Sequence, residues 1–139
     1  MNVWKWTSGN EFVFLAPLNS MASNIGGFTL HGWGEVPFKD ARGTTICSRS
    51  HVEDALHSSM LGKCGTLRLI CIDEVEATGA ETTGKLECNV RMHISAKDLF
   101  KYIGEGRQRS VRMFGGVNTL FFEDWWQLRP TGQIALMSD

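Results

Sequence analysis

Two adjacent carboxylates, Asp73 and Glu74, directly follow the apolar run at residues 67–72 (LRLICI). A nearly continuous apolar run of this length is typical of a strand buried on both faces of a parallel sheet. An apolar strand followed by Asp-Glu is the Walker B arrangement, in which the first carboxylate holds Mg²⁺ and the second orients or deprotonates the water that attacks the γ-phosphate of ATP. We therefore expect Asp73 to be a metal ligand and Glu74 a catalytic residue. The alternative is an acidic pair that simply ends a strand at the surface.

Two further apolar runs predict the strands that must position this pair. Residues 12–16 (FVFLA) end at Pro17, and residues 117–122 (VNTLFF) end at Glu123 and Asp124. Together with the helical segments between them, the three runs predict a parallel α/β layout. Ligands of such sheets bind at the carboxyl ends of the strands.

The helices are expected in three places, with loop elsewhere. Ser50 is a plausible cap for a helix with Val52, Ala55, Leu56 and Met60 on one face, which Gly62 would end. Residues 78–91 favour helix. Another helix is expected from Ser95, with the apolar stripe Leu99, Phe100 and Ile103, and it would end near Gly104. Residues 32–45 are expected to form loop with little regular structure.

Composition favours one domain over residues 1–139 and excludes few functions. The hydrophobic content of 42% and the charged content of 21% are ordinary for a globular domain. The formal net charge of −1 gives no global reason to bind nucleic acid, so such binding needs a local patch. No apolar run approaches the ~18 residues of a membrane span. The four cysteines form no CxxC pair, which favours reduced structural thiols and an intracellular protein.

Three separated segments resemble, in the right order, motifs of the superfamily-one DNA helicases of the Pif-one type, which are related to the RecD helicases. Residues 14–33 (FLAPLNSMASNIGGFTLHGW) look like motif Ia, residues 69–77 (LICIDEVEA) resemble the Walker B signature, and residues 113–130 (MFGGVNTLFFEDWWQLRP) are similar to motif III. The resemblance implies a RecA-like parallel sheet flanked by helices, as an incomplete P-loop NTPase domain.

The resemblance also implies a function and further site residues. It implies an ATP-dependent DNA helicase that moves five-prime to three-prime, with Asp73 binding the Mg²⁺-nucleotide and Gln127 sensing the γ-phosphate in catalysis. Motif Ia implies contacts to single-stranded DNA from Asn19, Ser20 and His31. Roles in DNA repair, recombination and telomere maintenance, and a nuclear or mitochondrial location in a eukaryote, follow from the resemblance alone.

Several positions depart from the pattern of that family. Leu18 and Asn19 replace Thr-Gly, Glu76 replaces a serine after the Walker B pair, Glu123 replaces a glycine, and Arg129 replaces a proline. Glu76 and Glu123 add negative charge close to where phosphates would lie, and this repulsion lowers affinity unless a cation intervenes.

A phosphate-binding loop is not evident in the sequence. Residues 79–86 (GAETTGKL) match the spacing Gly-x-x-x-x-Gly-Lys, but Leu86 has no hydroxyl for Mg²⁺ and the segment follows the Walker B strand, so we expect a coincidence. We therefore expect a helicase fragment that is inactive alone and needs a Walker A segment and a second motor domain. The alternatives are a non-enzymatic α/β module that binds single-stranded DNA or a partner, and an ATPase of another family that uses residues 79–86.

Overall fold

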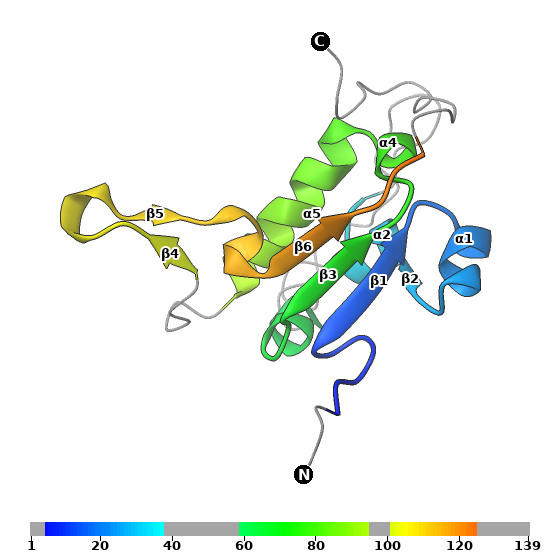
Figure 1. Cartoon of the computed structure of the whole chain (residues 1–139), viewed down its shortest axis with the longest axis horizontal. Helices are drawn as coiled ribbons and strands as arrows, with labels where there is room; N and C mark the ends of the chain where they lie inside the picture. The colour runs from blue at the N-terminus through cyan, green and yellow to red at the C-terminus, as the bar shows by residue number, and fades with distance from the viewer. Residues whose placement is uncertain (1–4, 38–58, 95–100, 125–139) are drawn as a thin grey trace, which may run out of the picture.

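A parallel four-stranded sheet forms the centre of the computed structural model, which describes residues 5–37, 59–94 and 101–124. The strand order is β2 (Phe28–Thr29), β1 (Phe12–Ala16), β3 (Leu69–Ile72) and β6 (Asn118–Phe121), and every pair is parallel. Figure 1 shows the four strands running in one direction, with α5 behind them. The predicted α/β class is confirmed, and all three apolar runs form strands.

The register of the sheet assigns the apolar side chains to two faces. Val13 pairs with Ile70 and Leu15 with Ile72, and these four side chains are fully buried on one face. Phe14, Cys71 and Leu120 are aligned on the opposite face, because side chains alternate along a strand. A slip by one residue would exchange the two sets, so burial of the first face fixes the register.

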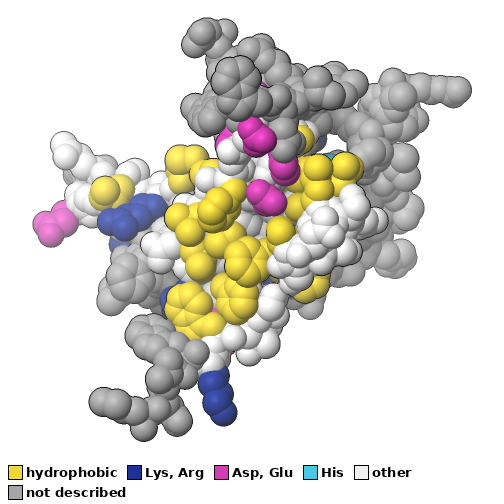
Figure 2. Space-filling view, turned by 45° about the vertical axis from the view of Figure 1, so that its right-hand side comes forward, with side chains coloured by type: hydrophobic (Ala, Val, Ile, Leu, Met, Phe, Trp, Pro, Cys, Tyr) yellow, Lys and Arg dark blue, Asp and Glu magenta, His cyan; other side chains and the backbone are white. Residues whose placement is uncertain are grey.

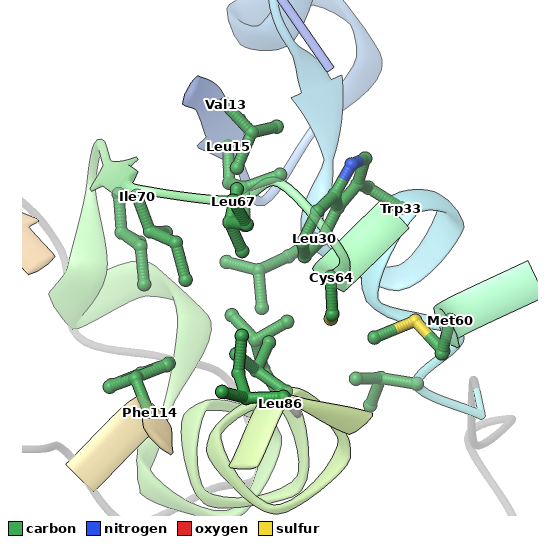
Figure 3. Packing of buried hydrophobic residues seen from close by; sticks show 14 of the residues in the cluster. Val13, Leu15, Leu30, Trp33, Met60, Cys64, Leu67, Ile70, Leu86 and Phe114 are labelled. Atoms are coloured by element: carbon green, nitrogen blue, oxygen red, sulfur yellow. The ribbon is translucent and has the colours of Figure 1, made fainter. Parts of the chain in front are cut away.

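Helices cover the face that carries Val13 and Ile70. They are α2 (Leu30–Gly34), α5 (Ala80–His93) and a helical segment at residues 59–64. Figure 3 shows Leu86 of α5 pointing towards Leu15 and Ile70 across the core. Trp33 is also buried in this core.

Polar contacts hold the covering helices together. Lys63 Nζ bonds both the Trp33 carbonyl oxygen and Glu35 Oε1 at 2.9 Å, and Asn89 Nδ2 donates to the Gly34 carbonyl oxygen at 2.8 Å. These bonds satisfy carbonyl groups at the end of α2, where a helix leaves its last carbonyls without partners. They therefore join α2 to both of its neighbours.

The opposite face of the sheet is less well covered in the part of the chain that the structure describes. Leu120 is 50% exposed and Phe122 is 49% exposed on this face. Figure 2 shows a continuous hydrophobic area on this side of the molecule. Because parallel sheets normally bury both faces, so large an exposed hydrophobic area is unusual for this fold.

The structure corrects the first part of the loop expected at residues 32–45, because residues 32–34 are helical, and it adds a short helix before them; residues 38–45 lie outside the described residues. Residues 30–34 form α2, whose first turn is capped because Gly32 N donates to Thr29 Oγ1 at 3.1 Å. A further helix, α1 (Asn19–Asn24), follows β1. Neither helix is long enough to show a clear apolar period, which explains why the sequence pattern missed them.

The predicted ends of two other helices are also corrected. The helix expected from Ser50 continues past Gly62 to residue 64, and its first part lies outside the described residues. The helix expected from Ser95 is wrong at Ile103, which lies in β4 (Tyr102–Ile103); residues 95–100 lie outside the described residues. The left-handed glycines Gly104 and Gly106 turn the chain there, and β4 pairs antiparallel with β5 (Ser110–Val111).

The remaining elements are short. They are α4 (Val75–Thr78), the 3₁₀ turn η1 (Gly106–Gln108) and the 3₁₀ turn η2 (Met113–Gly116). The Phe114 amide donates to Glu87 Oε1 at 3.2 Å, which ties η2 to α5 just before β6 begins. Residues 78–91, expected to be helical, match α4 and α5 closely.

Three cysteines are free thiols, as the sequence predicts, and Cys47 lies outside the described residues. Burial raises the pKa of the Cys64 thiol to about 11, with a small opposing effect from Lys63. Burial also raises the pKa of Cys71. Both groups are therefore neutral core thiols at physiological pH.

Two glycines give opposite expectations for stability. A Cβ atom at Gly27 would overlap the carbonyl oxygen of Phe14, whereas a Cβ at Gly84 in α5 would meet nothing within 4 Å. We expect Gly27→Ala to lower the free energy of unfolding by about 1–3 kcal/mol. We expect Gly84→Ala to raise it by about 0.5–1 kcal/mol, because alanine favours helix. Urea unfolding of both variants checks this, and shifts in the same direction would contradict the packing described here.

Candidate functional site

The carboxyl ends of three neighbouring strands are joined by backbone hydrogen bonds. The Asp73 amide donates to the Leu15 carbonyl at 2.9 Å, and the Phe122 amide donates to the Ile72 carbonyl at 2.8 Å. The Val75 amide reaches the Phe122 carbonyl at 3.3 Å. These bonds bring the residues after β1, β3 and β6 to one edge of the sheet, as predicted from the three apolar runs.

Asp73 is half-buried at the end of the central pair of strands. It lines a small cavity of about 270 Å³ whose other walls are Phe14, Ile25, Cys71 and Phe122. Within the described residues, no group of three or more His, Cys, Asp and Glu side chains is arranged to hold a metal. Mg²⁺ is commonly held by one or two carboxylates together with substrate phosphates and water, and Asp73 fits that pattern.

Glu74 has an unusual backbone conformation. Its φ of 52° and ψ of 47° lie in the left-handed region, and it immediately precedes α4. Non-glycine residues rarely adopt this conformation, which costs roughly 1–3 kcal/mol and is concentrated at functional sites. The Thr78 hydroxyl donates to the Glu74 carbonyl at 3.3 Å and helps to hold the turn. The strain is located at the position assigned to the water-activating carboxylate.

Two of the residues that depart from the helicase pattern touch each other. The Glu76 amide donates to Glu123 Oε2 at 2.9 Å. Burial raises the pKa of Glu123; the hydrogen bond from Glu76 opposes this, and the negative charges of Glu76, Glu74 and Asp124 add to the rise. In the described structure, Glu76 Oε2 is buried without a hydrogen-bond partner. This edge is therefore an acidic cluster, which Figure 2 shows beside the hydrophobic area.

The positions carried over as DNA contacts lie on the neighbouring strands. Asn19 and Ser20 are exposed in the first turn of α1, directly after β1. His31 is half-buried in α2, after β2, and its Nδ1 lies 3.2 Å from the Val36 carbonyl oxygen. Gln127 lies outside the described residues. The structure thus brings Asp73, Glu74 and Glu123 together and places Asn19 and Ser20 at the end of the adjacent strand.

The segment at residues 79–86 is not a phosphate loop. Gly79 is the N-cap of α5 and residues 80–86 lie within it, so the backbone amides of the segment point along the helix. Lys85 pairs with Glu81 at 2.7 Å, one helical turn away. The match to Gly-x-x-x-x-Gly-Lys is therefore coincidental, as the missing hydroxyl at Leu86 suggests.

No family model and no curated protein matches the chain. Among solved structures, a Bacteroides Pif1 in complex with ADP-AlF4 matches with a TM-score of 0.55 and 24% identity, over 88% of this chain and 24% of that one. The chain has the fold of part of a Pif1 helicase. The Pif1 helicase from Candida albicans matches with a TM-score of 0.55 and 19% identity, over 88% of this chain and 24% of that one.

A third solved structure, a Bacteroides Pif1 helicase in complex with ADP-AlF3 and ssDNA, has a TM-score of 0.56 at 22% identity over 91% of this chain. This chain covers 25% of that helicase. The chain therefore spans about a quarter of the length of these Pif1 proteins. At such low identities, the structural matches show a common fold, and they confirm the resemblance to Pif1 helicases.

Sequence reasoning missed the contact between Glu76 and Glu123. Both positions were noted as departures from the pattern, but each was considered separately. The available signal was their placement, because each follows closely on one of two strands expected to be neighbours.

Among the described residues, none of the helices has the length and apolar character that a membrane span requires.

Replacement of Glu123 tests the acidic cluster through pH. Because the folded protein raises the pKa of Glu123 above 4.5, the stability that this group contributes is complete below about pH 4.5 and is lost as pH rises through the raised pKa. We expect Glu123→Gln, measured without divalent cations, to unfold at a higher temperature than the wild type at pH 7, with the difference shrinking towards about pH 4.

The matched control is Glu123→Ala, which also removes the acceptor for the Glu76 amide. It should recover less stability than Glu123→Gln, because the amide loses its partner. If the difference in unfolding temperature between Glu123→Gln and the wild type is constant across this pH range, the charge on Glu123 does not destabilise the folded protein.

Proposed function

We propose that the chain supplies part of the ATPase motor of an ATP-dependent DNA helicase that moves five-prime to three-prime. The observation that carries this proposal is the Asp73–Glu74 pair at the end of β3, with its left-handed Glu74, in a fold shared with Pif1 helicases. In the complete motor, ATP hydrolysis at this edge would drive DNA unwinding. A motor of this kind depends on positioning and electrostatic stabilisation more than on covalent chemistry.

Each carboxylate has a distinct part in the proposed mechanism. Asp73 would hold Mg²⁺, and Glu74 would orient or deprotonate the attacking water. Bound Mg²⁺ would neutralise charge on the transferred phosphate, which offsets the repulsion from Glu76 and Glu123. Gln127, after β6, would contact the γ-phosphate and relay the nucleotide state.

Single-stranded DNA is the second proposed ligand. Asn19 and Ser20 offer an amide and a hydroxyl on an exposed turn, and His31 lies after the next strand. Groups of this kind bind a DNA backbone without reading its sequence. The turn at Asn19 is linked to the nucleotide edge through β1, whose neighbour β3 carries Asp73.

The exposed edge of β6 supports the proposal that further polypeptide completes the motor domain. In the described sheet, β6 has β3 as a neighbour on one side and is an edge on the other. Leu120 is 50% exposed on one face and Phe121 is 45% exposed on the other. An edge strand with apolar side chains on both faces is expected to pair with another strand.

A cleft beside β6 supports the same proposal. It has a volume of about 550 Å³ and lies between α5 and the segment leading into β6. Its surface is mainly apolar, and the residues that line it include Thr83, Met113 and Phe121. We propose that the Walker A segment pairs its strand with β6 and packs its helix in this cleft. The second motor domain of the helicase would then close over the nucleotide.

A nucleotide titration tests the isolated chain. We expect neither ATP binding nor DNA-stimulated ATPase from the purified chain, because the described residues offer carboxylates but no phosphate loop. The measurement is a titration with a fluorescent ATP analogue and Mg²⁺, with and without a single-stranded oligonucleotide. Binding lost in Lys85→Ala would instead revive a nucleotide site at residues 79–86, and oligonucleotide binding alone would favour the non-enzymatic module.

A chimera provides the complementary test. In it, this chain replaces the quarter of the Bacteroides Pif1 helicase that it matches. We expect the chimera to show DNA-stimulated ATPase, and Glu74→Gln to lower its rate by about 100-fold or more while nucleotide binding persists. Glu123→Gln is the control, since it alters a carboxylate outside the proposed catalytic pair. A folded chimera that binds nucleotide but hydrolyses equally well with Glu74→Gln would overturn the proposed role of Glu74.

The uncovered face predicts the solution behaviour of the free chain. We expect it to bind a hydrophobic dye and to self-associate, because Leu120 and Phe122 expose about half of their surface. Leu120→Ser with Phe122→Ser should lower both, as measured by dye fluorescence and sedimentation. Val13→Ser, in the buried core, should instead unfold the chain. If the double variant self-associates as strongly as the wild type, the surface that causes self-association does not include Leu120 and Phe122.

A further inference from the structure

The β4–β5 hairpin concentrates positive charge in a nearly neutral chain. Residues 101–112 contain four basic residues and one acidic residue, whereas the whole chain has a formal net charge of −1. Figure 1 shows the hairpin projecting away from the sheet, on the side where β6 begins. This position is opposite to the acidic strand ends, so the basic surface is separate from the proposed nucleotide edge.

The base of the hairpin is anchored and its outer part is exposed. Lys101 is buried, and its amine donates to the Ile94 carbonyl at 2.6 Å, so this cation serves the fold. Arg109 lies over the Tyr102 ring, with its guanidinium carbon 3.9 Å from the ring centroid. Stacking of this kind holds a guanidinium flat and leaves its N–H groups to bind a ligand at the rim.

Arg112 leads from the hairpin into a separate pocket. Its amide donates to the Lys101 carbonyl at 2.8 Å, and the residue lines a cavity of about 300 Å³ together with Arg68, Gly115, Gly116 and Asn118. Leu67 and Val117 complete the lining, which includes no carboxylate. A pocket lined by two arginines and by no carboxylate is suited to an anion.

Neither Arg109 nor Arg112 belongs to the ion pairs seen in the part of the chain that the structure describes, which include Lys63 with Glu35, Lys85 with Glu81 and Arg91 with Glu87. Both arginines are exposed. Their N–H groups therefore remain able to form charge-assisted bonds, the strong class of hydrogen bond, with an external anion.

We propose that Arg109 and the Arg112 pocket bind the phosphate backbone of single-stranded nucleic acid. The ligand class rests on the proposed function, while the site is a second surface, distant from Asn19 and Ser20. Two separate arginine positions suit a polymer with repeated phosphates, because each position takes one phosphate and no base needs to be read. A strand held here lies beside the start of β6, at the far end of the sheet from its catalytic edge.

The test is fluorescence anisotropy of a labelled twenty-nucleotide oligothymidine with the full chain, over a series of salt concentrations. We expect Arg109→Gln with Arg112→Gln to weaken binding by about ten-fold or more. The slope of log affinity against log salt should fall by about 1.4, since each phosphate contact on a single strand contributes about 0.7. Circular dichroism checks that the variant keeps its fold.

Matched variants separate this site from general charge and from the proposed function. Lys85→Gln removes an exposed cation on α5 and should leave the salt dependence of binding unchanged. Arg109→Lys with Arg112→Lys keeps both charges and should retain most of the wild-type salt dependence. Asn19→Ala with Ser20→Ala tests the other DNA surface. Binding that is lost only in the Asn19 variant overturns the hairpin site but leaves the helicase proposal intact.

Two further outcomes would also overturn the hairpin site. One is a wild-type chain that shows no oligonucleotide binding even at low salt. The other is inorganic phosphate or pyrophosphate binding that depends on Arg112 while oligonucleotide binding does not, which would identify the pocket as a site for small anions. Oligonucleotide affinity and salt slope that both depend on the two arginines support the proposal.

Discussion

The parallel pairing of β3 with β1 on one side and β6 on the other is the interaction on which the rest of the structure depends. Burial of Val13, Leu15, Ile70 and Ile72 on one face fixes the register, because a slip of one residue would expose them all. With the register fixed, the amide of Asp73 reaches the end of β1 and the end of β6 reaches back to β3. The position of the acidic edge is therefore a consequence of core packing.

The same pairing explains what could be predicted from the sequence. Three apolar runs with polar ends were sufficient to place Asp73 and Glu74 at the edge of a parallel sheet. The left-handed conformation of Glu74 could not be predicted, because it depends on how β3 meets α4 and not on residue type. The contact between Glu76 and Glu123 joins positions 47 residues apart and needed the sheet order as well. Ile103 fitted a helical stripe, but glycines and strand pairing decided its conformation.

Charge is distributed unevenly along the strand direction. The carboxyl ends of the strands carry Asp73, Glu74, Glu76 and Glu123, while Arg68 and Arg112 line a pocket where β3 and β6 begin. A formal net charge of −1 hides this separation. Because the carboxyl ends of the strands are acidic and this pocket is lined by arginines, a polyanion approaching the molecule is oriented by the field before it makes contact. In the proposed motor, the acidic end would repel phosphates unless Mg²⁺ is bound, so metal and nucleotide are expected to bind together.

β6 is an edge of the sheet among the described residues, and this edge also bears on how long the chain survives. A strand with unpaired backbone groups and apolar side chains on both faces is a template for any extended segment, including another copy of itself. Chaperones and proteases recognise such surfaces, and the steady-state level of a protein follows how often they are uncovered. If further polypeptide pairs with β6 as proposed, the amount of this chain in a cell would depend on how quickly that polypeptide is made and docks. Synthesis of both segments in one chain is the simplest way to keep their amounts equal.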